Sequence, residues 1–290
     1  VAVPHRAVVR LVCETDYVQF CAADTIGQIA SFGFDALTFE IWGALCHGGR
    51  IAILKKETVL SPAQLAAAFR RLHVDTIFIT AALLNQVARE DPSAFGTLST
   101  VIAGGEALDP HWIRTVLETD PPARLLNGYG PTENTTFTAC GLIEAVEPAS
   151  QSIPIGRPIA NTQAYILDDD LQPVAAGVEG WLYASGEGLA RGYLGRRDLT
   201  ADSFLPNPFG STAGARIYWT GDRARHLPDG RIAFLGRRDD QIKLRGHRIE
   251  LGEIRAAVQA CPGVLDVVVV SREDVPDERY LAAYIVAETS

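Results

Sequence analysis

The residues best suited to chemistry in this 290-residue chain stand together between Asn127 and Thr136. A turn rich in glycine and proline, residues 127–131, leads directly into Thr132-Glu133-Asn134-Thr135-Thr136. Glycines allow the backbone to approach a ligand closely, and proline stiffens the turn that presents the next residues. A threonine hydroxyl beside a glutamate suits a phosphate oxygen and its Mg²⁺, because Mg²⁺ takes one or two carboxylates together with substrate phosphates. Considered alone, the same pattern is equally typical of a polar surface hairpin.

Three other positions offer polar groups next to predicted elements, and two of them, Asp35 and Asp222, have two interpretations. The Gly104-Gly105-Glu106 turn follows a predicted strand, Thr100 to Ala103, but its context does not match a dinucleotide-binding fingerprint. Asp35 stands where a helix is expected to begin, so it is either an N-cap or a carboxylate that pairs with a substrate ammonium. Asp222 is expected just past a strand, as part of a turn or as an acceptor for a ribose diol.

The elements that must position these residues alternate between strand and helix over the first half of the chain. Helices are predicted from about His5 and Asp35, over 61–72 and 81–88, and from about Pro110, and strands over 17–20, 50–54, 76–79 and 100–103. This alternation predicts an α/β fold of layered sheets with parallel strands, which gathers ligands at the carboxyl ends of the strands.

Past residue 150 the pattern changes to short strands separated by glycine and proline, which predicts a small β-barrel or twisted sheets. From residue 250 it changes again, to a helix over 250–260 followed by two strands, 265–270 and 280–286. This last part reads as a small α+β domain that stops before it is complete.

Composition excludes several classes of function. The net charge is −9 and the cations are scattered, which argues against a nucleic-acid groove. No apolar run is long enough to cross a membrane, and no signal peptide is present, so a cytoplasmic location is expected. The five cysteines are widely spaced without a Cys-x-x-Cys pair, which predicts reduced and mostly buried thiols. The chain starts with Val1 and contains no methionine, which suggests a fragment.

Five ordered motifs give the chain a specific resemblance. They are Phe34-Asp35-Ala36, residues 127–133, residues 186–194, residues 218–222 and the charged segment 236–253. In this order they resemble the adenylation domains of nonribosomal peptide synthetases, within the superfamily of adenylate-forming enzymes that includes acyl-CoA ligases and luciferases. The resemblance covers nearly all of this chain but only the middle of a full domain, with an N-terminal core over 1–238 and a truncated C-terminal lid over 239–290.

The resemblance implies a role for each matching position at a nucleotide site. Asn127, Tyr129 and the turn at Gly104, Gly105 and Glu106 would hold the adenine, with Phe234 packed nearby. Thr132 would meet the α-phosphate and Glu133 would bind Mg²⁺. Asp222 would accept hydrogen bonds from the ribose, assisted by Arg237. Asp239 would be the hinge to the lid, whose Lys243 and Gly246 would serve when the acyl group passes to a thiol.

The resemblance also implies an amino-acid pocket, with Asp35 pairing with the α-ammonium. The residues carried over are Asp35, Ala36, Phe39, Ile79, Ile102, Gly104, Gly128, Thr136 and Phe137. This wall is aliphatic and aromatic apart from Thr136, and a buried unpaired charge would be costly there. It resembles valine-type pockets, with leucine and isoleucine as close alternatives, because one methylene is worth only about 1–3 kcal/mol in such a pocket.

The implied reaction is activation of an amino acid with ATP and Mg²⁺ and its loading onto the phosphopantetheine thiol of a peptidyl carrier protein. A condensation domain and a small MbtH-like protein are further partners that the resemblance implies. The phosphate loop and the catalytic lysine of the family fall outside the chain, so weak or absent activity is expected of the fragment itself. Two alternatives remain: a non-catalytic module that binds nucleotide or amino acid, and a carboxylate–CoA ligase of the same superfamily, against which Asp35 argues.

Overall fold

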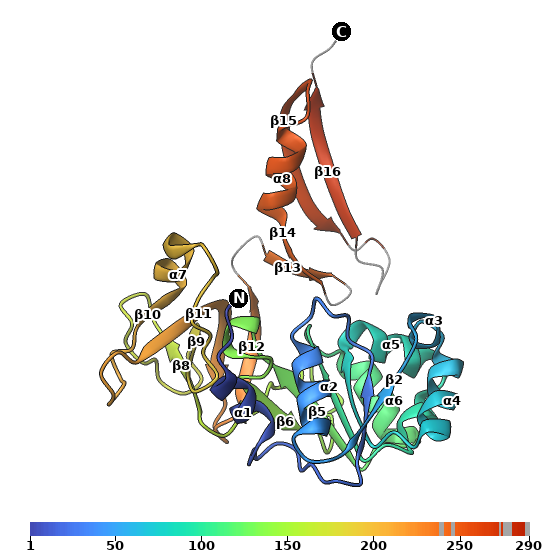
Figure 1. Cartoon of the computed structure of the whole chain (residues 1–290). Helices are drawn as coiled ribbons and strands as arrows, with labels where there is room; N and C mark the ends of the chain where they lie inside the picture. Colours follow the sequence, from blue (N-terminus) through green and yellow to red (C-terminus); the bar gives the residue numbers. More distant parts are fainter. Residues whose placement is uncertain (238–240, 245–246, 273, 275–279, 288–290) are drawn as a thin grey trace. The chain divides into compact units, whose positions relative to one another are not determined.

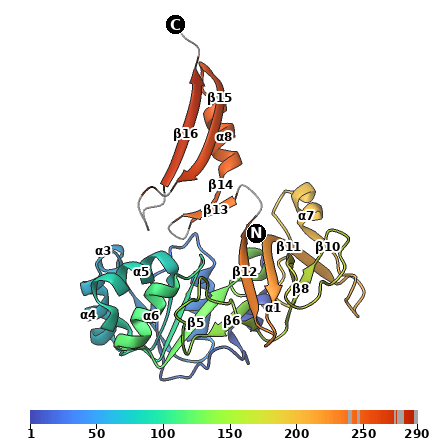
Figure 2. The same cartoon turned by 180° about the vertical axis from the view of Figure 1, so that it is seen from behind.

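The structure is a computed structural model that describes residues 1–237, 241–244, 247–272, 274 and 280–287. It divides into two compact units, Val1–Gly236 and Arg237–Ser290, and each is described here by itself. Figures 1 and 2 show opposite sides. In both views helices α3 to α6 gather at one end of the first unit, and a β-rich region lies at its other end.

A seven-stranded sheet forms the centre of the first unit, in the order β2-β1-β3-β4-β5-β6-β7. Strands β2, β1, β3, β4 and β5 are parallel to one another. Strand β6 pairs antiparallel with β5, and β7 pairs antiparallel with β6. The strands are β1 (Thr25–Gln28), β2 (Arg50–Ile53), β3 (Thr76–Thr80), β4 (Thr100–Gly104), β5 (Arg124–Tyr129), β6 (Ala139–Leu142) and β7 (Arg157–Pro158). The predicted α/β layering with parallel strands is confirmed.

One face of this sheet, here called the aliphatic face, packs against the helices at one end of the unit. The helical segments there are α3 (Lys56–Val59), α4 (Pro62–Leu72), α5 (Ala81–Glu90), the 3₁₀ turn η1 (Pro92–Phe95) and α6 (Pro110–Thr119). Alternate strand residues such as Ile77, Ile79 and Val101 contribute to this core, whose buried members are nearly all aliphatic apart from Phe69 and Phe95. Burial of this large apolar surface is the main source of stability for the unit.

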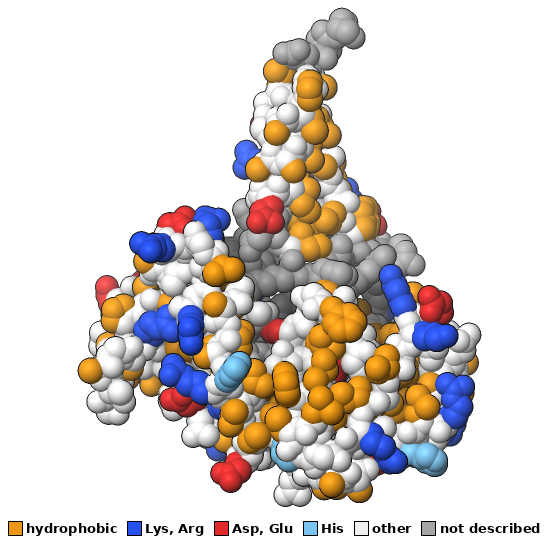
Figure 3. Space-filling view, viewed as in Figure 1, with side chains coloured by type: hydrophobic (Ala, Val, Ile, Leu, Met, Phe, Trp, Pro, Cys, Tyr) orange, Lys and Arg blue, Asp and Glu red, His pale blue; other side chains and the backbone are white. Residues whose placement is uncertain are grey.

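The opposite face, here called the aromatic face, carries the intervening strand residues. Phe78, Ile102 and Leu126 pack there with α1 (His5–Val12) and α2 (Ala36–Leu45). Strand side chains alternate between faces, so neighbours such as Phe78 and Ile79 belong to different cores. Trp42 and Leu45 of α2 are exposed. Hydrophobic side chains gather over α2 in Figure 3. Helix α2 is therefore apolar on both sides.

The β-rich region contains a five-stranded sheet in the order β10-β11-β9-β8, with β12 paired to β11. Its members, with α7 beside them, are β8 (Thr162–Leu167), β9 (Gly180–Gly186), α7 (Arg197–Ser203), β10 (Phe204–Pro206), β11 (Arg216–His226) and β12 (Ile232–Arg237). A bridge between Gly156 and Ile232 joins it to the segment before β7. The β-rich region is thus tied to the antiparallel edge of the larger sheet.

The second unit contains two antiparallel hairpins and one helix. These elements are β13 (Gln241–Leu244), β14 (His247–Glu250), α8 (Leu251–Gln259), β15 (Val264–Arg272) and β16 (Tyr280–Ala287). They match the predicted order of a helix followed by two strands.

Two expectations from the sequence are wrong. Residues 17–20 form no strand; instead Tyr17 and Phe20 pack their rings against Phe39 on the aromatic face, so burial and not strand pairing explains this apolar run. The five cysteines are free, but three are exposed and two half-buried, so they are not mostly buried. No helix in the described part of the chain is long and apolar enough to cross a membrane.

Candidate functional site

Residues 127–137, here called the central stretch, run from the end of β5 through a turn to β6, which pairs with β5 in the antiparallel direction. Between these strands the 3₁₀ turn η2 (Thr132–Asn134) is followed by Thr135 and Thr136, whose φ angles are +52° and +64°. Positive φ is uncommon for β-branched residues and is a sign of local strain. Surrounding contacts must hold this turn in place, and such strain is often found at functional sites.

Glu133 is 2% exposed, so its carboxylate lies inside the protein rather than on a surface hairpin. Its Oε1 accepts a hydrogen bond from the Tyr193 hydroxyl at 2.7 Å, and its carbonyl accepts one from the Ala190 amide at 2.8 Å. Burial, and then the Glu133 carboxylate, raise the pKa of Tyr193. Two predicted motifs, residues 127–133 and 186–194, therefore meet at this carboxylate.

Asp222 lies within β11. The sequence predicted it just past the end of a strand, and that placement is wrong. The pairing of β11 with β9 is irregular between Trp219 and Arg223, and a bulge of this kind redirects side chains near functional sites. Asp222 is 5% exposed and accepts a hydrogen bond from the hydroxyl of Tyr129, at the end of β5. The ring of Tyr129 lies 6.2 Å from that of Phe234. Tyr129, Asp222 and Phe234 are thus brought together.

The other predicted nucleotide residues of this unit follow two neighbouring strands. Ala103 and Gly104 of β4 pair with Asn127 and Gly128 of β5, so the turn at 104–106 lies beside the central stretch. The amide nitrogen of Asn127 donates to the carbonyls of Ile153 and Pro154, which fixes the orientation of this buried side chain.

Asp35 occupies the N-cap position of α2, but its side chain makes no capping hydrogen bond. By contrast, Asp109 caps α6 by accepting from the His111 amide at 2.8 Å. The backbone carbonyl of Asp35 accepts a hydrogen bond from the Thr136 hydroxyl at 3.0 Å. The Asp35 carboxylate therefore does not cap α2, which was one of its two predicted roles. The backbone of Asp35 is bonded to the central stretch through Thr136.

Glu40, one turn into α2, holds the segment that leads to Asp35. Its carboxylate accepts hydrogen bonds from the amides of Ile29 and Ala30 at 3.1 Å each. Its side chain is buried, and this burial raises its pKa to about 7 against hydrogen bonds that favour the charged form. No pattern in the sequence distinguishes Glu40, because a glutamate inside a helix normally faces solvent.

Most of the predicted pocket residues meet on the aromatic face. The Phe137 ring lies 5.6 Å from that of Phe39 and 5.7 Å from that of Phe78. A Cβ atom built on Gly128 would stand 2.7 Å from Ile102 Cγ2 and 2.8 Å from Phe137 Cε1, so a larger residue there would require these side chains to shift. Ala36 belongs to the same core.

Ile79 is the exception among the pocket predictions. It is fully buried in the core of the aliphatic face, on the other side of β3 from Phe39, Ile102 and Phe137. Its neighbour Phe78 lies on the aromatic face instead and pairs in register with Ile102 of β4. Ile102 and Gly104 lie on the same side of β4 because strand side chains alternate. Phe78 is the residue of β3 on that side, but this follows only from the register of β3 with β4.

The remaining predicted residues fall in the second unit. Lys243 lies in β13 and pairs with Arg248 of β14. Arg237 is the last residue of β12. Asp239, the predicted hinge, and Gly246 lie outside the described residues.

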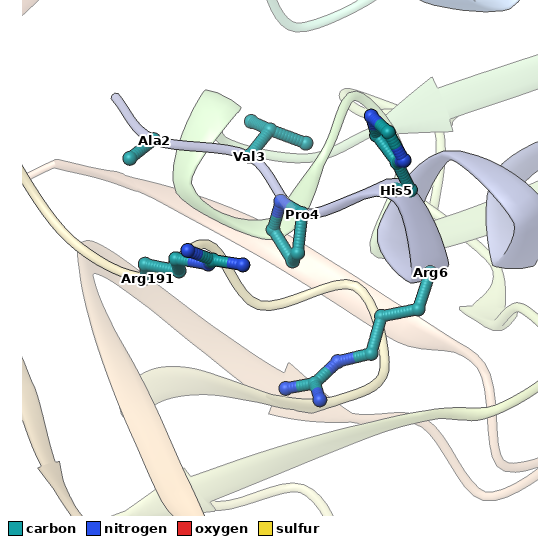
Figure 4. Close-up of a pocket in the computed structure, with 6 residues that line it drawn as sticks. All are labelled: Ala2, Val3, Pro4, His5, Arg6 and Arg191. Atoms are coloured by element: carbon teal, nitrogen blue, oxygen red, sulfur yellow. The ribbon is translucent and has the colours of Figure 1, made fainter.

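A separate hollow of about 480 Å³ lies at the start of α1 and is lined by Ala2, Val3, Pro4, His5, Arg6 and Arg191 (Figure 4). Arg6 is already paired with Glu187 at 3.2 Å, and backbone hydrogen bonds tie Ala2 to Arg191 and Gly192. We assign no ligand to it.

Among the described residues no group of three or more His, Cys, Asp and Glu side chains is arranged to hold a metal ion. A single carboxylate such as Glu133 still suits Mg²⁺ that arrives with a nucleotide, because phosphate oxygens and waters complete its shell.

Residues 1–194 match the family model described as AMP-binding enzyme, which is about two thirds of the chain. The chain belongs to the AMP-binding enzyme family. The matched range contains the central stretch, Asp35 and the 186–194 motif.

The curated relatives are much longer than this chain. It is 46% identical over 288 residues to tyrocidine synthase 3 of Brevibacillus parabrevis, covering 99% of the chain and 4% of that protein. It is 45% identical over 290 residues to surfactin synthase subunit 2 of Bacillus subtilis, covering 99% of the chain and 8% of that protein. The chain thus spans less than a tenth of the length of these peptide synthases.

Solved structures agree. A nonribosomal peptide synthetase protein containing adenylation and PCP domains, bound to a vinylsulfonamide inhibitor, superimposes with a TM-score of 0.91 at 34% identity. The match covers 99% of this chain and 49% of that one. An artificially fused adenylation–PCP di-domain from Klebsiella oxytoca gives 0.88 at 27% identity, with coverage of 99% and 53%. The resemblance to adenylation domains that the five motifs indicated is confirmed.

Proposed function

We propose that this chain forms the amino-acid-activating part of a nonribosomal peptide synthetase and makes an aminoacyl-adenylate from ATP. One observation carries the proposal: the stretch from Asn127 to Phe137 contains one of the three acidic positions that the reaction needs, Glu133, and is hydrogen-bonded to the other two, Asp222 and Asp35. Tyr129 bonds to Asp222, Glu133 is held by Tyr193, and Thr136 bonds to the backbone of Asp35.

At the nucleotide end, Asp222 accepts the ribose hydroxyls and Thr132 meets the α-phosphate. Glu133 is the residue that holds Mg²⁺, which supplies positive charge against the phosphates. The adenine is surrounded by Tyr129, Phe234 and the turn at 104–106. Asn127 contacts it through its side-chain amide, which the carbonyls of Ile153 and Pro154 hold in place. The close packing of Tyr129 with Phe234 and its bond to Asp222 support this arrangement.

At the amino-acid end, the Asp35 carboxylate pairs with the α-ammonium and the aromatic face surrounds the side chain. Phe78 takes the place that the sequence gave to Ile79, with Phe39, Ile102, Gly128 and Phe137 around it. This wall has no cation or carboxylate for a charged side chain, which supports an aliphatic substrate of valine type.

The reaction asks the protein to neutralise charge and align reactants. The substrate carboxylate oxygen attacks the α-phosphorus, a new P–O bond forms, and pyrophosphate leaves with the electron pair of the broken P–O bond. Orientation and fixed electrostatics supply the acceleration for such a step, and no protein nucleophile takes part.

Transfer of the aminoacyl group to the phosphopantetheine thiol of a peptidyl carrier protein completes the proposed function. Lys243 and Gly246 serve this step and Asp239 is the hinge, with residues 1–238 as the core and 239–290 as the lid. The similar solved structures that contain adenylation and PCP domains support a carrier protein as partner. A condensation domain and an MbtH-like protein remain further proposed partners.

Amino-acid-dependent exchange of pyrophosphate into ATP tests the proposal, measured on the chain and on any longer protein that contains it. Valine is expected to give the highest rate, followed by isoleucine and leucine. A flat profile across aliphatic amino acids contradicts the valine assignment, and binding of ATP without exchange favours a non-catalytic binding module.

A matched pair of variants tests the role of Asp35. Removing one partner of a buried charge pair costs about 2–5 kcal/mol, so Asp35→Ala is expected to lower kcat/KM for valine by about 30-fold or more. Asp109→Ala removes a true N-cap, costs about 1 kcal/mol of stability and leaves exchange unchanged. Full activation of amino acids by Asp35→Ala would instead favour a carboxylate–CoA ligase.

A further inference from the structure

Arg10 on α1 is a buried cation that bonds to the backbone and to no acidic side chain in the described part of the chain. It is 3% exposed, and it takes part in no ion pair among the described residues. Its guanidinium donates instead to backbone carbonyls: Nη1 to Phe137 at 2.6 Å, and Nη2 to Asn134 at 2.6 Å and Thr135 at 3.2 Å. Burial lowers its pKa to about 10. A buried charge is retained at a cost, so its contacts call for a reason.

The carbonyls that Arg10 binds belong to the turn with the strained backbone. Thr135 and Thr136 both have positive φ, and the three acceptor carbonyls belong to Asn134 before them, to Thr135 itself and to Phe137 after them. The planar fork of an arginine presents several donors in a fixed geometry, which allows one side chain to fix several carbonyls at once.

The two ends of this turn serve different parts of the proposed site. Glu133 precedes the residues bound by Arg10, and Phe137 ends them on the aromatic face. Thr136 between them bonds to Asp35. A shift of the turn would therefore move the Mg²⁺ end and the amino-acid end together.

A second feature shows that the fold makes room for the guanidinium. A Cβ atom on Gly188 would stand 2.0 Å from Arg10 Nη2 and 2.6 Å from Asn134 Oδ1. The carbonyl of Gly188 also accepts from the Thr135 hydroxyl at 2.8 Å. The 186–194 motif thus closes over Arg10 and the turn from the other side.

We propose that Arg10 is a positioning residue that couples the Mg²⁺–phosphate end of the site to the amino-acid pocket by holding the turn 134–137. This inference rests on the proposed function and adds a residue that touches neither substrate. Small misplacements of reacting groups cost up to about 100-fold in rate, so loss of this contact affects both substrates.

Arg10→Met tests the coupling, because it keeps the length of the side chain and removes all its donors. We expect the KM for ATP and the KM for the amino acid to rise together, with kcat lowered about tenfold or more. Arg10→Lys keeps the charge and part of the donor set and is expected to recover part of the loss. Gly188→Ala, which displaces the guanidinium without removing it, is expected to raise the same two constants.

The chain offers a matched control in Arg114, which also donates to backbone carbonyls, of Val146, Glu147 and Pro148. Arg114→Met is expected to change thermal stability only. If Arg10→Met raises only one KM, or changes the kinetics no more than Arg114→Met, the coupling role is wrong.

Hydrogen exchange gives a readout that needs no turnover. Arg10→Met is expected to speed amide exchange over residues 132–138, and Arg114→Met over 143–150. Unchanged exchange over 132–138 overturns the inference even if the wild-type chain is active. Absence of pyrophosphate exchange both in the chain and in a longer protein that contains it refutes the proposed function alone.

Discussion

The two faces of the seven-stranded sheet are built from the same strands but differ in what they bury. The aliphatic face packs α4, α5, α6 and η1 around a core that is aliphatic apart from Phe69 and Phe95, and none of the buried charged residues that the structure describes lies in it. The face with α1 and α2 is rich in aromatic rings and adjoins Arg10, Glu40 and Glu133, all of them buried. One face stabilises the fold, and the other uses part of that stability to hold polar groups where water is excluded.

Phe78 and Ile79 give the sharpest test of this comparison, because adjacent residues point to opposite faces. Ile79→Ala leaves a cavity in the aliphatic core and is expected to lower the free energy of unfolding by about 2–5 kcal/mol. The amino-acid profile of pyrophosphate exchange should not change. Phe78→Ala is expected to destabilise by about 3–5 kcal/mol and also to shift the profile towards larger side chains.

Urea unfolding and an exchange profile over alanine, valine, leucine and phenylalanine measure both effects. A changed profile in Ile79→Ala, or an unchanged one in Phe78→Ala, would remove the functional distinction between the faces.

Glu40, which is buried beside the aromatic face, is expected to make the free energy of unfolding depend on pH. Its folded-state pKa of about 7 lies above the ordinary 4.5, so the folded protein binds this proton more tightly than the unfolded chain. The resulting stabilisation is fully present below pH 4.5 and is lost as the pH rises to about 7, at up to about 1.4 kcal/mol per pH unit. In Glu40→Gln this loss is absent.

The difference between wild type and Glu40→Gln in free energy of unfolding, measured from pH 4 to pH 8, isolates this group from other titrations. Parallel curves for the two proteins would show that Glu40 keeps an ordinary pKa in the folded state.

The smallest expected effect comes from Gly128, which lies on the aromatic face between Ile102 and Phe137. Gly128→Ala places a methyl group in the proposed amino-acid pocket. One methyl group is worth about 1–3 kcal/mol there, so kcat/KM for valine should fall about 10- to 200-fold relative to that for alanine. Competition between the two amino acids in one exchange assay gives this ratio directly, and an unchanged ratio would place the pocket elsewhere.

Much of the fold followed from local sequence. The alternation of apolar segments with turn residues predicted β3, α5 and β4, and short-range propensity and hydrophobic period are sufficient for such elements. The strand predicted over residues 17–20 is wrong. Aromatic residues favour strands, but here Tyr17 and Phe20 fill a core that other segments create.

The sequence by itself determined which residues could take part in the chemistry, because the motifs that contain Asp35, Asn127 to Glu133 and Asp222 occur together in the order found in adenylation domains. Only the tertiary structure decided how they are placed. The face of β3 that holds Phe78 depends on its register with β4, and a shift of one residue would have exchanged it with Ile79. Arg10 meets its carbonyls across more than 120 residues of chain, a contact that no local pattern encodes.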